Sequence, residues 1–230
     1  MFKNSTNTLI NTLKNTFFPP ICFNCGKKTT KNYLCLSCKK QIKVLGPPFS
    51  YTQLKINNSN YKKTITVLSS CNYKNPIKNL IYSFKYKHCD YLAGFLSRFM
   101  VKQLKITKFK SQDYDFIIPV PLHPYKMKIR GYNQAELLAK QIAKYFQLPL
   151  KNDIIHSKYT ENSQTKLSSK KRQENVKGKF IVKENFTNKN ILLIDDVFTT
   201  GATISTCCRS LGEKGVDKIF VLTLAKTIKN

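Results

Sequence analysis

Short apolar runs recur along the second half of the chain. Residues 116–120 (FIIPV), 154–155, 191–194 (ILLI) and 219–225 are rich in Ile, Val and Leu and are flanked by polar sequence. Runs of this length and composition predict buried strands. A Thr-, Ile- and Val-rich stretch from 64 to 73 predicts one more strand in the first half.

Amphipathic patterns separate these runs. Asn75 and Pro76 suit the N-cap and the first position of a helix. Asn133 forms a capping-box-like pair with Glu136 at the start of another helix, and a polar loop is expected between the FIIPV strand and that helix. The expected helices cover about residues 3–18, 76–84, 90–99, 133–142 and 202–215. Strands that alternate with helices favour an α/β fold with a parallel sheet.

The chain is long enough for one domain of ordinary size with a small appendage. It has 230 residues, 41% of them hydrophobic, and its 15 Phe and 12 Tyr support a packed core. No apolar run approaches the roughly 18–20 residues that a membrane span needs. The first 18 residues are too polar for a secretory signal. We therefore expect a cytoplasmic protein without a membrane span.

Two cysteine pairs lie near the start of the chain. Cys22 and Cys25 form the first C-x2-C pair, and Cys35 and Cys38 form the second. Two such turns can supply four thiolates to one tetrahedral zinc ion, which would stabilise a unit too small to fold alone. Disulfides are the competing interpretation, but a cytosolic chain disfavours them. We predict a structural zinc site with no catalytic role.

The apolar run at 191–194 leads into two carboxylates and a small polar loop. Asp195 and Asp196 can accept hydrogen bonds from vicinal sugar hydroxyls or approach a divalent cation. The loop behind them opens a helix whose N–H groups and hydroxyls can surround a phosphate. A strand that ends in a capping Asp is the plainer alternative, but it leaves the second Asp and the threonines unexplained. The predicted phosphate loop is Thr199, Thr200, Gly201, Ala202 and Thr203.

The net charge of +28 permits nucleic-acid binding, since Lys and Arg neutralise phosphates. Solvated lysines that reflect the base composition of an AT-rich genome explain the charge equally well. The chain has only four arginines, and where lysine is the default cation a retained arginine can mark a position that needs a planar donor. They are Arg98, Arg130, Arg172 and Arg209.

Four separated motifs resemble the ComF family of competence proteins. They are PVPLHP at 119–124, RGYNQA at 130–135, the Gln/Ser/Arg/Asn pattern at 164–176 and IDDVFTTGAT at 194–203. The last also resembles the 5-phosphoribosyl 1-pyrophosphate (PRPP) motif of type I phosphoribosyltransferases. The resemblance covers about residues 17–226. It implies a type I phosphoribosyltransferase-like parallel sheet with helices on both faces, preceded by a four-cysteine zinc ribbon.

The resemblance also implies roles for residues. Asp195 and Asp196 would hold the ribose hydroxyls, and the phosphate loop would hold the 5-phosphate of PRPP, with Mg²⁺. Arg130 would lie near the pyrophosphate, and the segment around Lys171 and Arg172 would be a mobile loop with anion contacts. Both arginines could instead be ordinary surface residues.

The resemblance leaves the function open. ComF-like proteins are implied in handling single-stranded DNA on the cytoplasmic side during natural transformation, alongside other proteins of the competence machinery. A phosphoribosyltransferase of nucleotide salvage and a PRPP-responsive regulatory protein are the alternatives. The expected organisation is a helical segment at 1–18, a zinc ribbon at 19–48 and a phosphoribosyltransferase-like domain at 49–230.

Overall fold

The structure is a computed structural model of the chain. The helix expected over 3–18 lies outside the part that the structure describes, as do Lys171 and Arg172. The described residues are 20–29, 33–57, 61–157 and 180–228.

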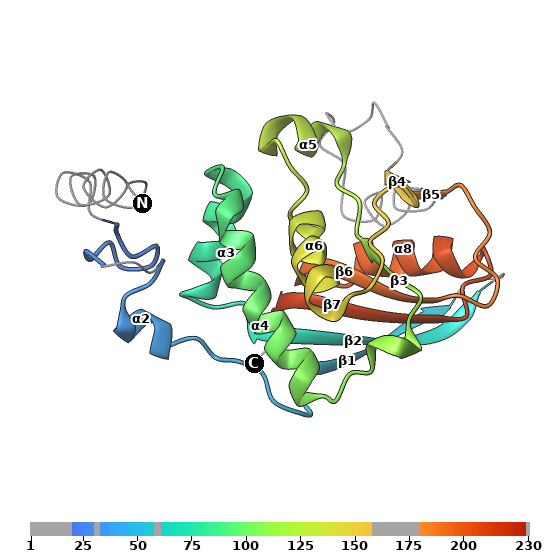
Figure 1. Ribbon diagram of the computed structural model, residues 1–230, viewed down its shortest axis with the longest axis horizontal. Helices are drawn as coiled ribbons and strands as arrows, with labels where there is room; N and C mark the ends of the chain where they lie inside the picture. Colours follow the sequence, from blue (N-terminus) through green and yellow to red (C-terminus); the bar gives the residue numbers. More distant parts are fainter. Residues whose placement is uncertain (1–19, 30–32, 58–60, 158–179, 229–230) are drawn as a thin grey trace, which may run out of the picture.

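A five-stranded sheet forms the centre of the fold, with the strand order β1-β2-β7-β6-β3 (Figure 1). β1 runs antiparallel to β2, and the remaining neighbours are parallel. A small antiparallel pair, β4 and β5, stands apart from this sheet. The strands are β1 (Tyr51–Asn57), β2 (Lys62–Asn72), β3 (Phe116–Pro119), β4 (Ile155–Ser157), β5 (Phe180–Val182), β6 (Asn190–Phe198) and β7 (Lys218–Lys226).

Helices cover both faces of the sheet, as expected. One apolar cluster joins the sheet to α3, α4 and α6, and a second joins it to α8. No helix in the described ranges is long and apolar enough to cross a membrane. The helices are α2 (Leu36–Lys40), α3 (Ile77–Tyr86), η1 (Asp90–Leu92), α4 (Ala93–Ile106), η2 (Ser111–Asp113), α5 (Pro124–Arg130), α6 (Gln134–Phe146) and α8 (Ala202–Gly212).

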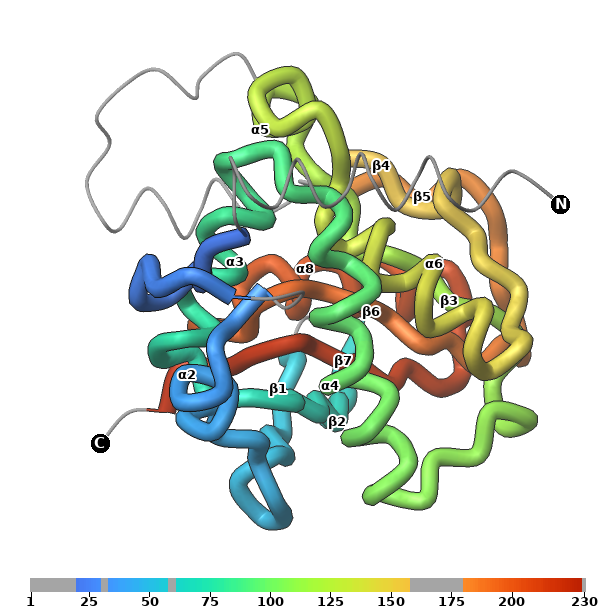
Figure 2. Tube along the Cα trace, turned by 60° about the vertical axis from the view of Figure 1, so that its left-hand side comes forward, coloured from blue at the N-terminus to red at the C-terminus, as the bar shows by residue number. Residues whose placement is uncertain are grey.

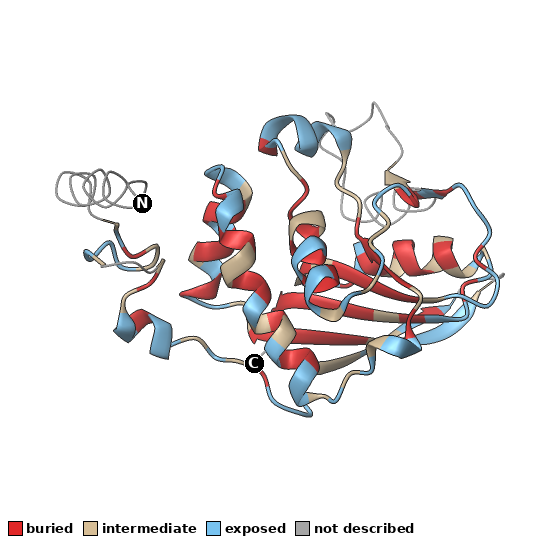
Figure 3. Cartoon of the chain, viewed as in Figure 1, coloured by how far each residue is buried: buried red, intermediate tan, exposed pale blue. Residues whose placement is uncertain are grey.

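The apolar residues of β6 do not alternate with polar ones, because this strand is covered on both faces. Ile191 and Leu193 belong to the cluster with α8, whereas Leu192 and Ile194 belong to the cluster with α3, α4 and α6. Successive side chains of a strand point to opposite faces, so a strand covered on both sides needs apolar residues at every position. The strands β3, β6 and β7 are accordingly buried along most of their length (Figure 3).

Three local predictions need correction. The position before α3 is occupied by Pro76, and no side chain caps this helix, so Asn75 is not its N-cap. The loop expected after β3 contains α5, whose N-cap is His123. The capping-box pair of Asn133 and Glu136 is the third correction. Asn133 does cap α6, by accepting from the N–H of Ala135, but Glu136 accepts a hydrogen bond from Asn152 Nδ2 at 3.1 Å. The seven residues of α5 are too few to show the apolar periodicity that predicts a helix.

The strands β1 and β5 were not expected. β1 is an edge strand that pairs with β2, and four of its seven residues are exposed or partly exposed polar ones. Gly46–Pro48, expected to be a linker, forms the turn before it. On the other side of this turn, the N–H of Leu45 donates to Ser70 O at 2.9 Å. The connection is therefore tied to the sheet at both ends.

The four-cysteine segment packs against the start of the main domain. Cys22, Leu34 and Cys38 are buried in the same apolar cluster as α3 and α4. The ring of Tyr33 lies 5.7 Å from that of Tyr91 and 5.4 Å from that of Phe95. Figure 2 shows this segment, in blue, beside α3. A boundary near residue 48 remains a prediction.

Candidate functional site

A pocket of about 320 Å³ opens where β3 and β6 end. The carboxyl ends of parallel strands are where α/β folds bind ligands. Its walls come from α3, from the β3–α6 connection, from β4 and β5, and from the start of α8. The lining residues that carry charge or a side-chain hydroxyl are Tyr73, Lys85, Lys126, Arg130, Ser157, Asp195, Asp196, Thr199 and Thr203.

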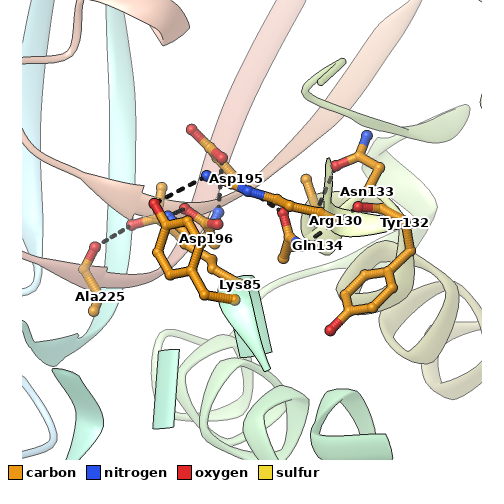
Figure 4. A network of polar contacts seen from close by, with 11 residues as sticks. Lys85, Arg130, Tyr132, Asn133, Gln134, Asp195, Asp196 and Ala225 are labelled. Carbon is orange, nitrogen blue, oxygen red and sulfur yellow. Dashed lines mark hydrogen bonds and ion pairs between the residues drawn. The ribbon is translucent and has the colours of Figure 1, made fainter. Parts of the chain in front are cut away.

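The two carboxylates of β6 both line the pocket but differ in environment. Burial, and then the neighbouring charge of Asp196, raise the pKa of Asp195 to about 7. Asp196 is 7% exposed, and its Oδ1 lies 2.8 Å from Lys85 Nζ (Figure 4). One carboxylate is thus held by an ion pair, and the other can change its charge near neutral pH.

The predicted phosphate loop lies between β6 and α8. Gly201 occupies the N-cap position of α8 with a φ of 78°, a backbone conformation that residues other than glycine rarely adopt. A Cβ atom at this position would lie 3.0 Å from Leu54 and from the ring of Phe198. The loop surrounds a hollow of about 40 Å³, and Thr199 and Thr203 also line the larger pocket. The helix N-terminus and these hydroxyls can hold an anion.

Arg130 ends α5 and is buried, so it is not an ordinary surface residue. Its Nη1 donates to Gln134 Oε1 at 2.9 Å, and its Nη2 donates to Tyr86 OH at 3.2 Å (Figure 4). These partners orient the guanidinium at the pocket wall. A planar donor fixed in this way suits a phosphate or pyrophosphate group.

The neighbouring motif residues make hydrogen bonds that hold the chain in place, and Asn133 also lines the pocket. Asn133 Nδ2 donates to Val120 O at 3.0 Å while its Oδ1 caps α6. The Tyr132 hydroxyl donates to Phe84 O at 2.7 Å. His123 Nδ1 accepts from the N–H of Tyr125 at 3.2 Å, although His123 also lines the pocket. These contacts fix the β3–α6 connection that carries Arg130.

The sequence did not single out Lys85, Tyr86 or Lys126. Lys85 and Tyr86 come from the last turn of α3, more than 100 residues before the carboxylates, and Lys126 lies on the unexpected α5. Nothing in the local sequence distinguishes these lysines from the other lysines of the chain. Only the folding of α3 into the same apolar cluster as β6 brings Lys85 to Asp196.

The four cysteines of the N-terminal segment meet in space. Their sulfur atoms all lie within 4.8 Å of one another, and Cys25 Sγ and Cys35 Sγ are 3.7 Å apart. Tetrahedral ligands with Zn–S bonds of about 2.3 Å would have sulfur atoms about 3.8 Å apart. The Ser37 hydroxyl, 3.2 Å from Cys35 Sγ, is the main cause that lowers the pKa of that thiol to about 6. The spacing of the four sulfur atoms therefore fits a single metal ion bound by thiolates.

A basic groove of about 540 Å³ runs between α4 and α6. Arg98, Lys102 and Lys105 of α4 line it, and no carboxylate does. Tyr145 of α6 is 50% exposed, and Lys105 Nζ lies 4.8 Å from the centre of its ring. The groove thus combines three cations with an accessible aromatic ring.

Comparison with known proteins agrees with this architecture. Residues 133–229 match the phosphoribosyl transferase domain. Competence protein F of Haemophilus influenzae is 31% identical over 228 residues, which cover 91% of this chain and 98% of that protein. Competence protein ComFC of Streptococcus pneumoniae is 31% identical over 157 residues, 67% of this chain and 65% of that protein. The DNA utilization protein YhgH of Escherichia coli K12 is 25% identical over 216 residues, 90% of this chain and 91% of that protein.

Solved structures are similar at a lower level. The purine phosphoribosyltransferase of Pyrococcus horikoshii has a TM-score of 0.35 and 16% identity, over 62% of this chain and 75% of that chain. The fold assignment rests instead on the domain match and the sheet.

The class is a type I phosphoribosyltransferase-like α/β protein with an N-terminal four-cysteine cluster. At 31% identity across nearly the whole of competence protein F, the chain belongs to the ComF family.

Proposed function

We propose that the pocket binds PRPP together with Mg²⁺. The observation that carries the proposal is the meeting, in one pocket, of a carboxylate pair, a phosphate-sized hollow at a helix N-terminus and a fixed arginine. Asp195 and Asp196 would accept hydrogen bonds from the ribose hydroxyls. The phosphate loop would hold the 5-phosphate, and Arg130 would face the pyrophosphate. Bound Mg²⁺ would neutralise part of the phosphate charge, as it commonly does beside carboxylates and phosphates.

The direct test is a calorimetric titration of the folded, metal-loaded chain with PRPP in the presence of Mg²⁺. We expect a dissociation constant in the micromolar range. Ribose 5-phosphate lacks the pyrophosphate that Arg130 would face, so it should bind more weakly. Absence of binding by PRPP would mean that the loop is retained only as part of the fold.

Whether PRPP is turned over is a separate question. A phosphoribosyltransferase breaks the bond between the anomeric carbon and pyrophosphate as a nucleophile bonds to that carbon. The sequence between residues 64 and 100, which would form part of the acceptor site, contains no recognisable base-recognition motif. An acceptor screen is therefore the measurement that decides between binding and turnover. Release of pyrophosphate with one acceptor from a broad panel would favour the enzyme instead.

We further propose that the chain handles single-stranded DNA during natural transformation, on the cytoplasmic side and with other competence proteins. The names of its relatives connect them with competence and DNA utilization. The groove between α4 and α6 supports this role because cations can follow a phosphate backbone while an exposed ring stacks on a base. Arg98 is one of only four arginines in the chain, and it lies in this groove.

Replacing Arg98, Lys102 and Lys105 together with glutamine should weaken binding to an oligothymidine by about tenfold or more. Each lost phosphate contact also lowers the slope of log K against log salt by about 0.7, so the slope should fall by about 2. The measurement is fluorescence anisotropy at several salt concentrations. Tyr145→Ala should weaken binding without changing the slope, because stacking releases no counterions.

The matched control replaces three exposed lysines away from the groove, Lys55, Lys62 and Lys183, with glutamine. Both triple variants lose the same number of charges. The control should retain affinity to within about threefold. Equal losses in the two variants would show that any DNA binding reflects net charge alone.

A further inference from the structure

Helix α3 makes polar contacts with the four-cysteine segment near its start and with residues of the pocket at its end. Near its start, Asn79 Nδ2 donates to Asn24 Oδ1 at 3.0 Å. Asn24 Nδ2 in turn donates to Cys38 Sγ at 3.2 Å. Asn79 is therefore one hydrogen-bonded residue away from a thiol of the four-cysteine cluster. Such outer contacts orient the ligands of a metal and tune its binding.

The last turn of the same helix reaches the pocket. Lys85 forms the ion pair with Asp196, and the hydroxyl of Tyr86 accepts from Arg130. Both partners belong to the proposed PRPP site. The position of α3 therefore sets where the cation of Lys85 and the guanidinium of Arg130 lie.

The apolar side chains of α3 are tightly packed in the core of the domain. Ile77, Leu80, Ile81 and Phe84 are all at most 1% exposed. Tightly packed interiors transmit small displacements rather than absorb them. A shift at Asn79 would therefore be felt at Lys85 and Tyr86, two turns further along.

We infer that α3 couples metal occupancy of the four-cysteine cluster to ligand affinity of the pocket. A thiolate bound to metal holds Asn24, Asn24 holds Asn79, and α3 then keeps Lys85 and Tyr86 at the pocket wall. Metal binding and ligand binding strengthen each other, and by linkage they do so by the same factor. This inference rests on the proposed PRPP site, because PRPP is the probe for the pocket.

The test compares PRPP affinity in two metal states of the full chain. The zinc-loaded protein is titrated with PRPP and Mg²⁺, and the titration is repeated after zinc is stripped and the chelator removed. We expect the loaded chain to bind PRPP about 5- to 150-fold more tightly, the usual range for coupled sites. Competition with a chromogenic chelator should show zinc affinity rising by the same factor when PRPP is present.

Asn79→Ala separates coupling from simple unfolding, because it keeps all four cysteines. The variant should still hold one zinc ion, and its coupling factor should fall by about threefold or more, the effect of one lost hydrogen bond. Lys78→Ala is the control, since Lys78 is exposed on the same helix and next to Asn79. It should behave as the unmodified chain.

The outcomes distinguish the two proposals. If PRPP binds to neither metal state, the proposed PRPP site fails and the coupling fails with it. If PRPP binds equally in both metal states, or if Asn79→Ala leaves the coupling factor unchanged, the inference about α3 is overturned while the PRPP site stands.

Discussion

A chain carrying Asp195→Asn and Asp196→Asn is expected to bind PRPP at least 100-fold more weakly than the unmodified chain. A hydrogen bond to a charged acceptor contributes about 1.5–3 kcal/mol, and both carboxylates would accept from the ribose. Loss of two such bonds corresponds to about 3–6 kcal/mol, and about 1.4 kcal/mol is a factor of ten. Calorimetric titration with Mg²⁺ at pH 8, above the pKa of about 7 for Asp195, measures the effect.

The variant should remain folded for a reason visible in the pocket. The folded-state pKa of Asp195, about 7, lies above its ordinary value of 3.8, so the folded state holds this proton more tightly. Stability from this group is present at low pH and declines as the pH rises toward 7. Asparagine at 195 removes that loss of stability at pH 8. It therefore offsets part of the stability lost through asparagine at 196, which leaves Lys85 without its ion-pair partner.

The matched control neutralises two exposed carboxylates outside the pocket, by Asp153→Asn and Glu184→Gln. It changes the net charge as much as the pocket variant does. PRPP affinity should stay within about twofold. A pocket variant that binds PRPP as tightly as this control would contradict the assignment of the carboxylates to the ribose.

Replacing Cys22 and Cys38 with serine should abolish zinc binding and open the N-terminal segment. Zinc content should fall from one ion per chain to none. Structural zinc contributes about 10–16 kcal/mol to the folding of isolated zinc-finger peptides. The segment has only a few buried apolar residues of its own, among them Leu34, so it cannot stay folded without the metal. Metal analysis and limited proteolysis are the measurements, with cleavage expected between residues 20 and 48.

The global stability should fall as well, because this segment shares a core with α3 and α4. We expect Tm to drop by at least about 5 °C, given that about 1 kcal/mol shifts Tm by 2–4 °C at this size. Cys208→Ala is the control, since Cys208 is a buried thiol of α8 far along the chain from the cluster. It should keep one zinc ion. Zinc bound equally by the serine variant would refute the four-thiolate site.

The elements with a strong local pattern were predicted from the sequence. The apolar runs of β3, β6 and β7 predict strands, because a strand buried on both faces needs apolar residues throughout. The helical spacing of the apolar residues after Pro76 predicts α3. The cysteine spacing identified a set of four thiols that do meet in space. Edge strand β1 and short α5 were missed, since neither buries enough surface to impose a pattern.

The sequence by itself determined the class of fold and the family, and it led to the proposed phosphate loop, because each depends on residues that are neighbours along the chain. Tertiary structure alone decided that Lys85 pairs with Asp196, that Tyr86 holds Arg130 and that Asn79 contacts Asn24 beside the cysteine cluster. These partners are separated by tens of residues or more, and one lysine or asparagine looks like another in sequence. Only the packing of α3 between the four-cysteine segment and the sheet selects which of them meet.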